Sequence, residues 1–230
     1  MQPEFAAIPV LFADADFAVL DKPPGLPVHP GPRRGPSVED WFPALARGRA
    51  GPWLAHRLDA DTSGCLVVAR RRAALLAAQA AFAAGRVRKI YWAIVSGHPP
   101  GESGRVEVPL AKRTGPSGWR MAADPAGQPA ITDWVLRGRA DGMSWLELRP
   151  RTGRTHQLRV HCAGLGCPIL GDAVYGSGGP QLHLVARAVD LPLDPPLHVV
   201  APPPAHMQVA LRQTGWDPAT AEPPGGRRAA

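Results

Sequence analysis

The chain has 230 residues, of which 45% are hydrophobic, a proportion that excludes global disorder and suffices for one good-sized domain or two small ones. Its formal net charge is +7, from 26 basic and 19 acidic residues, and 23 of the basic residues are arginine. Arginine binds phosphate through a planar, two-pronged set of donors, so this balance suits a polyanionic partner, although an arginine-biased genome gives the same composition.

The cysteines and the N-terminus indicate the compartment. Cys65, Cys162 and Cys167 are odd in number and form no Cys-x-x-Cys pair, so they predict no disulfide framework. The first residues lack the basic and apolar build of a signal peptide, and the longest apolar stretch, residues 73–84, is too short to span a bilayer. We therefore expect a soluble protein of the reducing cytoplasm.

Short strands dominate the elements predicted for the first part of the chain. Residues 8–30 give two strands around an Ala-Asp-Ala-Asp turn, followed by a proline-rich loop. Residues 64–70 predict a compact apolar strand, and residues 71–84 have the alanine and leucine content of a helix that Gly85 closes. Residues 88–97 predict the next strand, because they contain several β-branched and aromatic side chains.

The second part of the chain continues this pattern. We expect one short helix at 155–166, with Thr155 near its start and Gly166 past its end, and strands at 105–110, 131–137, 143–150, 182–191 and 197–200. Strands outnumber helices and are often neighbours in sequence, which predicts an α+β fold with a largely antiparallel sheet. The proline-rich residues 216–230 predict a loose C-terminal tail.

In the strand at 143–150 the side chains alternate between two faces. Trp145 and Glu147 fall on one face, and Leu146 and Leu148 fall on the other.

The segment His-Arg-Leu-Asp-Ala-Asp-Thr-Ser-Gly, residues 56–64, resembles the start of a calcium loop. With Asp59 as position one, position twelve should be a glutamate that binds calcium, but it is Arg70, a cation that would repel the ion. This excludes calcium and leaves two interpretations of Asp59. It is either an ordinary turn residue before a strand or a carboxylate that takes part in chemistry.

Other metal and cofactor motifs are absent from the sequence. The spacing of His156, His161, Cys162 and Cys167 does not match the usual zinc ligand patterns. The chain contains no Gly-x-x-x-x-Gly-Lys loop, no Gly-x-Gly-x-x-Gly fingerprint and no Gly-x-Ser-x-Gly elbow. We therefore expect neither a metal nor a nucleotide cofactor.

A second polar cluster, residues 149–161, lies where a strand passes into a helix and contains several arginines. Arginines beside the free N–H groups of a helix start favour phosphate binding. If this cluster and the one around Asp59 converge, one carboxylate faces several arginines.

Four motifs in order resemble the RluA-type pseudouridine synthases. His-Arg-Leu-Asp-x-x-Thr-Ser-Gly is similar to the family signature, and the family's other motifs are similar to "LDKPPGLPVHPG" at 20–31, "KIYWAIVSG" at 89–97 and "TGRTHQLRVHCAGLGCPILGDAVYG" at 152–176. With two closing segments, the resemblance runs over about residues 8–207. It implies a catalytic domain at 1–215, with helices and loops flanking the sheet, an active-site cleft across it and no S4-type RNA-binding domain.

By this resemblance the chain isomerises uridine to pseudouridine in structured rRNA, tRNA or both, as a monomer without cofactor or metal. The implied catalytic residues are Asp59, Tyr91 and Arg159, with Arg159 paired to Asp59. Asp59 attacks either C1′ of the ribose or C6 of the base. The alternative is an RNA-binding or RNA-folding protein with vestigial isomerase activity.

The resemblance also assigns residues around the reacting base. The implied substrate contacts are Arg57, which helps displace the target base, and Thr62, Arg154 and His156. For Thr62 a purely structural role is the alternative, as it is for three further motif residues, Lys22, His29 and Asp172.

Overall fold

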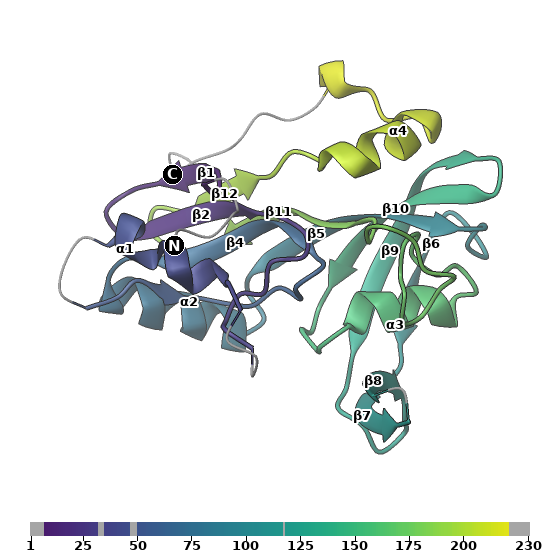
Figure 1. The fold of residues 1–230 in the computed structure, drawn as a ribbon, viewed down its shortest axis with the longest axis horizontal. Coiled ribbons are helices and arrows are strands. Elements are labelled where there is room, and N and C mark those ends of the chain that lie inside the picture. The colour runs from purple at the N-terminus through teal and green to yellow at the C-terminus, as the bar shows by residue number, and fades with distance from the viewer. Residues whose placement is uncertain (1–6, 32–34, 47–49, 117, 221–230) are drawn as a thin grey trace. The chain divides into compact units, whose positions relative to one another are not determined.

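The structure is a computed structural model that describes residues 7–31, 35–46, 50–116 and 118–220 (Figure 1). It divides into two compact units. Among the described residues, unit 1 contains 7–89 and 186–204, and unit 2 contains 90–185 and 205–220. Sheet strands and packed helices occur in both, which confirms the predicted α+β class with a mostly antiparallel sheet. That both units act as one catalytic domain, with a cleft across the sheet, stays a prediction.

The strands of unit 1 follow the order β1, β2, β4 and β11, with β3 paired to β4 and β12 paired to β11. The pairs β1–β2, β2–β4, β3–β4 and β11–β12 are antiparallel. These strands are β1 (Val10–Ala13), β2 (Phe17–Lys22), β3 (Trp53–Leu54), β4 (Ser63–Ala69), β11 (Leu184–Leu191) and β12 (Leu197–Val200). The helical elements are η1 (Val38–Trp41), α1 (Phe42–Leu45) and α2 (Arg72–Ala83).

Helix α2 covers one face of this sheet (Figure 1). Its small side chains, among them Ala74, Ala78 and Ala81, pack in one core cluster with Val19 of β2 and Val67 of β4. Alanines keep the helix close to the β-branched residues of the strands, which is how this pattern of small and branched residues fills a core.

The end of α2 is defined by backbone hydrogen bonds. The Gly85 N–H donates to Phe82 O and the Arg86 N–H donates to Ala81 O, both at 3.0 Å, which is a Schellman cap. The cap requires a left-handed residue, and Gly85 has a φ of 65°. The prediction that Gly85 closes this helix is confirmed.

The main sheet strands of unit 2 follow the order β5, β10, β9 and β6. The three pairs are antiparallel, and β7 and β8 form a separate two-stranded hairpin. The strands are β5 (Arg88–Ser96), β6 (Ser103–Glu107), β7 (Leu110–Gly115), β8 (Gly118–Ala123), β9 (Ile131–Ala140) and β10 (Met143–Pro150). The helical elements are α3 (Gln157–Gly164), α4 (Ala205–Gln213) and η2 (Pro218–Thr220).

Two helices cover the two faces of this sheet. Leu146 and Leu148 of β10 pack in one cluster with Leu158 of α3, whereas Trp145 packs in another with Met207 of α4. The predicted alternation of side chains along β10 is therefore confirmed. No described helix combines the length and apolar character that crossing a lipid bilayer requires.

The remaining predicted strands and helices occur close to their expected bounds, but several elements were not predicted. These are the hairpin β7–β8, strand β3, helix α4 and the short helical segment η1–α1. Thr155 lies near the start of α3, as expected, one residue before the N-cap His156.

The predicted tail begins too early. Trp216 is 8% exposed and packs with Ile94, Met207 and Leu211, so it belongs to the core of unit 2. An indole buries a large apolar surface in such a core, which holds the chain at this point. Residues 221–230 of the predicted tail lie outside the described residues.

Gly138 of β9 is required by the close approach of the segment after α4. A Cβ at this position would lie 1.6 Å from the carbonyl oxygen of Thr214, which is itself buried. We predict that Gly138→Ala lowers the free energy of unfolding by about 3 kcal/mol, since backbone must shift to admit the methyl group.

Chemical denaturation measures this effect, with Gly164→Ala as the control. A Cβ at Gly164 meets no atom within 4 Å and the residue is helical, so this change should be neutral or slightly stabilising. Equal stability of the two variants would contradict the steric argument.

Candidate active site

The turn that carries Asp59 lies directly before β4 in unit 1. The Thr62 N–H donates to the Asp59 carbonyl oxygen at 3.1 Å, which closes a four-residue turn. Asp59 is half-buried and Asp61 is exposed, while Thr62 is only 3% exposed. The turn therefore holds one carboxylate at the end of a buried strand and points the other into solvent.

The ammonium group of Lys22 ties this turn to the loop after β2. Its Nζ atom donates to three carbonyl oxygens, of Ala60 at 2.6 Å, Leu26 at 2.7 Å and Pro23 at 2.8 Å. The Gly25 N–H also donates to Ala60 O, at 2.9 Å. The two motifs at 20–31 and 56–64, which are far apart in sequence, thus meet at one buried cation.

Lys22 is fully buried, and three acceptors match the three hydrogens of an ammonium group. The pKa of Lys22 is lowered to about 7, because burial lowers it and the negative charges of Asp61 and Asp59 offset only part of that effect. The carboxylates of the turn and the buried cation therefore stabilise each other. The sequence left open a structural role for Lys22, and its contacts support that role.

His56 anchors the beginning of the same motif. Its Nε2 accepts the Val67 N–H at 3.0 Å, and its ring stacks on Phe82 of α2 with the centroids 5.0 Å apart. Burial, together with the charge of Lys89, lowers the pKa of His56 to about 4, so the imidazole is neutral and can accept this hydrogen bond. No role for His56 was predicted from the sequence, and its contacts with Val67 and Phe82 fix the start of the motif.

Unit 2 contains a buried ion pair between Arg159 of α3 and Asp172. The guanidinium group donates from Nε to Oδ2 at 2.8 Å and from Nη2 to Oδ1 at 2.7 Å. The two side chains are 4% and 0% exposed. Burial acts to raise the pKa of the Asp172 carboxyl, but hydrogen bonds from Arg159 and from the Val174 and Tyr175 N–H groups hold it below its usual value.

The sequence did not predict Asp172 as a partner of Arg159, and the structure describes a two-pronged bond between them. The expected pairing of Arg159 with Asp59 stays a prediction. A planar guanidinium group fits one carboxylate in this way, so Asp172 fixes where the cation of Arg159 lies. Asp172 is thus the residue that orients Arg159.

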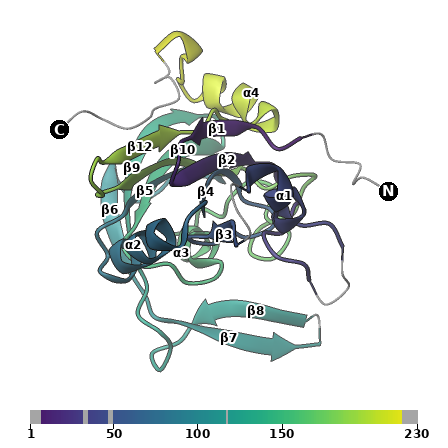
Figure 2. The same ribbon diagram turned by 90° about the vertical axis from the view of Figure 1, so that its left-hand side faces the viewer.

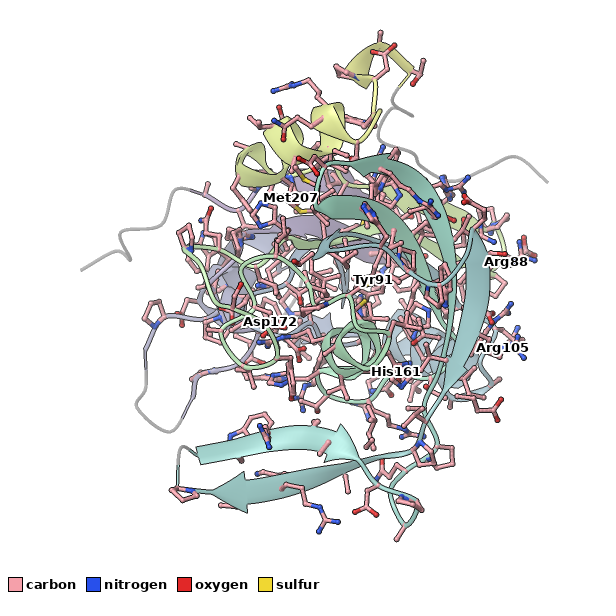
Figure 3. All side chains as sticks on the ribbon, turned by 90° about the vertical axis from the view of Figure 1, so that its right-hand side faces the viewer. Arg88, Tyr91, Arg105, His161, Asp172 and Met207 are labelled. Carbon is pink, nitrogen blue, oxygen red and sulfur yellow. The ribbon has the colours of Figure 1, made fainter. Side chains whose placement is uncertain are left out.

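Tyr91 lies in β5 opposite Leu148 of β10, and it packs half-buried against the core cluster of unit 2 that contains Leu146. Figure 3 labels both Tyr91 and Asp172. An aromatic ring in such a position has an apolar body fixed by the core and a polar hydroxyl at its tip.

The two RNA contacts predicted in unit 2 lie just before α3. Arg154 donates from Nε to Pro129 O at 3.0 Å. His156 has a φ of 52°, in the left-handed region, and its ring stacks on Trp119 of the hairpin with the centroids 5.2 Å apart. The Nδ1 atom of His156 lies 3.0 Å from the Tyr175 hydroxyl. A strained backbone that several contacts hold in place is typical of functional sites.

Unit 1 thus brings together Arg57, Asp59 and Thr62, and unit 2 brings together Arg154, His156 and Arg159. Arg57 is exposed. The burial of Thr62 leaves its side chain little surface for RNA, so its contacts favour the structural alternative over the predicted substrate contact. His29, the other scaffold residue, pairs with Glu39 at 2.7 Å on the surface.

No role for Trp119 or Tyr175 was predicted from the sequence. Tyr175 lies in a motif but is distant in sequence from the hairpin that it contacts, and Trp119 follows the sequence Gly-Pro-Ser-Gly, for which no hairpin was predicted. The turn dipeptides could have revealed the hairpin. Among the described residues, no three His, Cys, Asp or Glu side chains gather as metal ligands would.

Comparison with known proteins gives the following matches. The model of a family described as RNA pseudouridylate synthase matches residues 16–164. An uncharacterized RNA pseudouridine synthase of Zymomonas mobilis subsp. mobilis is 47% identical over 171 residues, which are 73% of this chain and 78% of that protein. Ribosomal large subunit pseudouridine synthase D of the same organism is 35% identical over 200 residues, 82% of this chain and 62% of that protein.

A solved structure, human RNA Pseudouridylate Synthase Domain Containing 4, aligns with a TM-score of 0.76 and 30% identity. The alignment covers 89% of this chain and 92% of the human chain.

The contacts of Lys22 lead to a test of its positioning role. Lys22→Met should lower the free energy of unfolding by about 3 kcal/mol, because it leaves three carbonyl oxygens without their donor. Urea denaturation measures the change. Arg72→Met, at an exposed position of α2, is the control and should change stability by less than about 0.5 kcal/mol. Equal effects of both substitutions would contradict the role of Lys22.

Asp21, in β2 opposite Cys65, gives a pH-dependent prediction. Burial raises its pKa from 3.8 to about 6, so its contribution to stability is fully present below pH 3.8 and is lost as the pH rises through 6. Between pH 4 and pH 7 the wild type should lose up to about 3 kcal/mol of stability relative to Asp21→Asn. The control, Asp141→Asn at an exposed position, should keep a constant difference from wild type. A pH-independent difference for Asp21→Asn would refute the shift.

Proposed function

Because this chain belongs to the RNA pseudouridylate synthase family, in its RluA-type branch, a family of isomerases, we propose that it converts specific uridines of RNA to pseudouridine. The reaction breaks the N1–C1′ bond, turns the base and joins C5 to C1′, and the proton of C5 leaves while N1 gains one. No atom of the nucleotide is lost apart from that exchange. The observation that carries the proposal is the half-buried Asp59 in the family signature, on a turn held by Lys22.

In this reaction Asp59 is the catalytic carboxylate. Cleavage of the glycosidic bond builds positive charge at C1′, which a neighbouring carboxylate can stabilise or trap covalently. The same carboxylate could instead add to C6 of the uracil ring and let the base detach. In either course the detached base is itself the returning nucleophile, so no second carboxylate is needed to activate water.

We assign Tyr91 and Arg159 to the same catalytic centre. The ring of Tyr91 can stack on the uracil, and its hydroxyl can assist removal of the C5 proton. Arg159 supplies a cation whose place is fixed by Asp172, and such a preorganised charge stabilises the anionic carboxylate and the departing base without reorganisation.

The remaining assigned residues bind RNA. Arg57, exposed beside the catalytic turn, takes the place of the target base in the stem and so offsets the few kcal/mol that flipping the base out costs. Arg154 and His156 bind phosphate or ribose, which positions the RNA without reading its sequence.

We propose that the target is large-subunit rRNA, tRNA or both, and that the protein acts in the cytoplasm as a monomer without metal or cofactor. The name of the relative, ribosomal large subunit pseudouridine synthase D, favours rRNA. The net charge of +7 suits either RNA. Mapping the pseudouridines that a deletion strain loses would identify the target nucleotide.

The decisive variant is Asp59→Asn, with Asp61→Asn in the same turn as its control. Asp59→Asn should lower turnover by roughly 10³-fold or more, because the catalytic carboxylate is lost, while Asp61→Asn should stay within about threefold of wild type. Turnover is measured as tritium released from C5 of [5-³H]uridine-labelled RNA from the deletion strain. The dissociation constant for that RNA should change little in either variant.

Near-normal turnover of Asp59→Asn would overturn the catalytic assignment. Wild-type protein that binds this RNA and releases no tritium would favour the alternative function, an RNA-binding or RNA-folding protein with vestigial activity.

A further inference from the structure

The hairpin β7–β8 presents cations and an indole to solvent. Lys112, Arg113 and Arg120 are exposed, and Trp119 is 47% exposed. The Lys112 ammonium group lies 4.9 Å from the centroid of the Trp119 ring. Cations interleaved with an aromatic ring are the composition that binds the phosphates and unpaired bases of RNA.

Strands β7 and β8 pair with each other in a two-stranded sheet, separate from the sheet that contains β5, β10, β9 and β6. Figure 2 shows β7 and β8 as a separate two-stranded layer beside α3. An apolar cavity of about 300 Å³ lies between β8 and α3, lined on the two sides by residues such as Met121 and Ala163. Where packing is incomplete, the remaining specific contacts determine how an element is placed.

Tyr175 makes one of these contacts. Its hydroxyl oxygen accepts the Met121 N–H of β8 at 2.9 Å and lies 3.0 Å from Nδ1 of His156. His156 in turn stacks on Trp119 of the same strand. The hydroxyl therefore joins the hairpin to the residue that begins α3.

The ring of the same tyrosine faces the buried ion pair. The Arg159 guanidinium carbon lies 5.3 Å from the centroid of the Tyr175 ring, within range of a cation–π interaction. The Tyr175 N–H also donates to Oδ1 of Asp172 at 3.0 Å. One residue thus contacts the hairpin through its hydroxyl and Arg159 with Asp172 through its ring and backbone.

We propose that Tyr175 is a positioning residue that ties an RNA-contacting hairpin, β7–β8, to the buried pair of Arg159 and Asp172. RNA that binds Lys112, Trp119 and Arg120 is thereby placed relative to Arg159, because the same tyrosine contacts both the hairpin and the guanidinium group. The two halves of the side chain act separately, since the hydroxyl fixes the hairpin and the ring fixes the guanidinium group. This inference rests on the proposed function for its substrate and for the role of Arg159.

The first arm of the test asks whether the hairpin contacts RNA. Large-subunit rRNA and tRNA from the deletion strain are used as separate probes. Arg120→Ala should raise the dissociation constant for the modified RNA class about 3- to 10-fold, since a phosphate contact is lost. Arg212→Ala, at an exposed arginine of α4, is the matched control and should leave it unchanged. Equal effects of the two would overturn the hairpin contact.

The second arm separates the two halves of Tyr175. Tyr175→Phe keeps the ring and removes the hydroxyl, so hydrogen exchange of the Met121 amide should rise about 10-fold or more and RNA affinity should fall as in Arg120→Ala. The double variant Arg120→Ala/Tyr175→Phe should bind RNA no more weakly than Tyr175→Phe alone, because both substitutions act through the same hairpin. Tyr175→Leu also removes the ring. Its kcat should be about 10-fold lower than that of Tyr175→Phe, and its RNA affinity should be similar to that of Tyr175→Phe.

If Tyr175 were only structural, both substitutions would lower thermal stability, but loss of the hydroxyl would not selectively lower RNA affinity and loss of the ring would not selectively lower kcat. Wild-type exchange at Met121 and wild-type affinity in Tyr175→Phe would overturn the proposal, and so would equal kcat values for Tyr175→Phe and Tyr175→Leu. The binding and exchange measurements need no turnover. If the wild type forms no pseudouridine, the proposed function fails while these measurements still decide whether Tyr175 anchors an RNA-contacting hairpin.

Discussion

The arrangement around the turn of Asp59 depends on a buried ammonium group. Removing a lysine from water is costly unless each of its hydrogens finds an acceptor, and Lys22 meets this condition with three carbonyl oxygens from two separate loops. Because the acceptors must converge on one atom, the loop after β2 and the turn before β4 have little freedom to move apart. Asp59 is held in the same way, because Lys22 binds the carbonyl oxygen of Ala60, the residue that follows Asp59. A carboxylate that must meet one atom of a flipped base benefits from such preorganisation.

Unit 2 uses the same physical device with a different cation. Arg159 is buried against Asp172, and the carboxylate is further satisfied by two backbone N–H groups of the loop that follows it. A buried pair of this kind contributes little net stability, but it specifies where its charges lie. The loop that supplies those N–H groups also supplies Tyr175, which reaches the hairpin. One short segment therefore both places the buried charges and anchors the hairpin.

Local sequence patterns predicted most of the regular structure. The strands β2, β4, β5 and β10 are dense in branched and aromatic residues, and the Gly85 cap follows from a single glycine. The hairpin β7–β8 was missed because its strands are mostly polar and exposed, so no alternation of apolar residues marks them. Helix α4 follows a run of prolines that suggested irregular chain, and its stability comes from Met207 and Leu211 in a core assembled from distant strands.

The sequence by itself determined the family signature, the carboxylate at its centre and the exclusion of calcium, because these depend on which residues stand at fixed short spacings. Only the tertiary structure decided which side chains contact each other. Arg159 pairs with Asp172, Lys22 donates to Ala60 in the turn of Asp59, and the Tyr175 hydroxyl accepts the Met121 N–H of the hairpin. Each of these contacts links residues that are far apart in the chain or face each other across a loop. Spacing in sequence carries no information on such pairs, since the folded backbone alone determines which buried charge meets which acceptor.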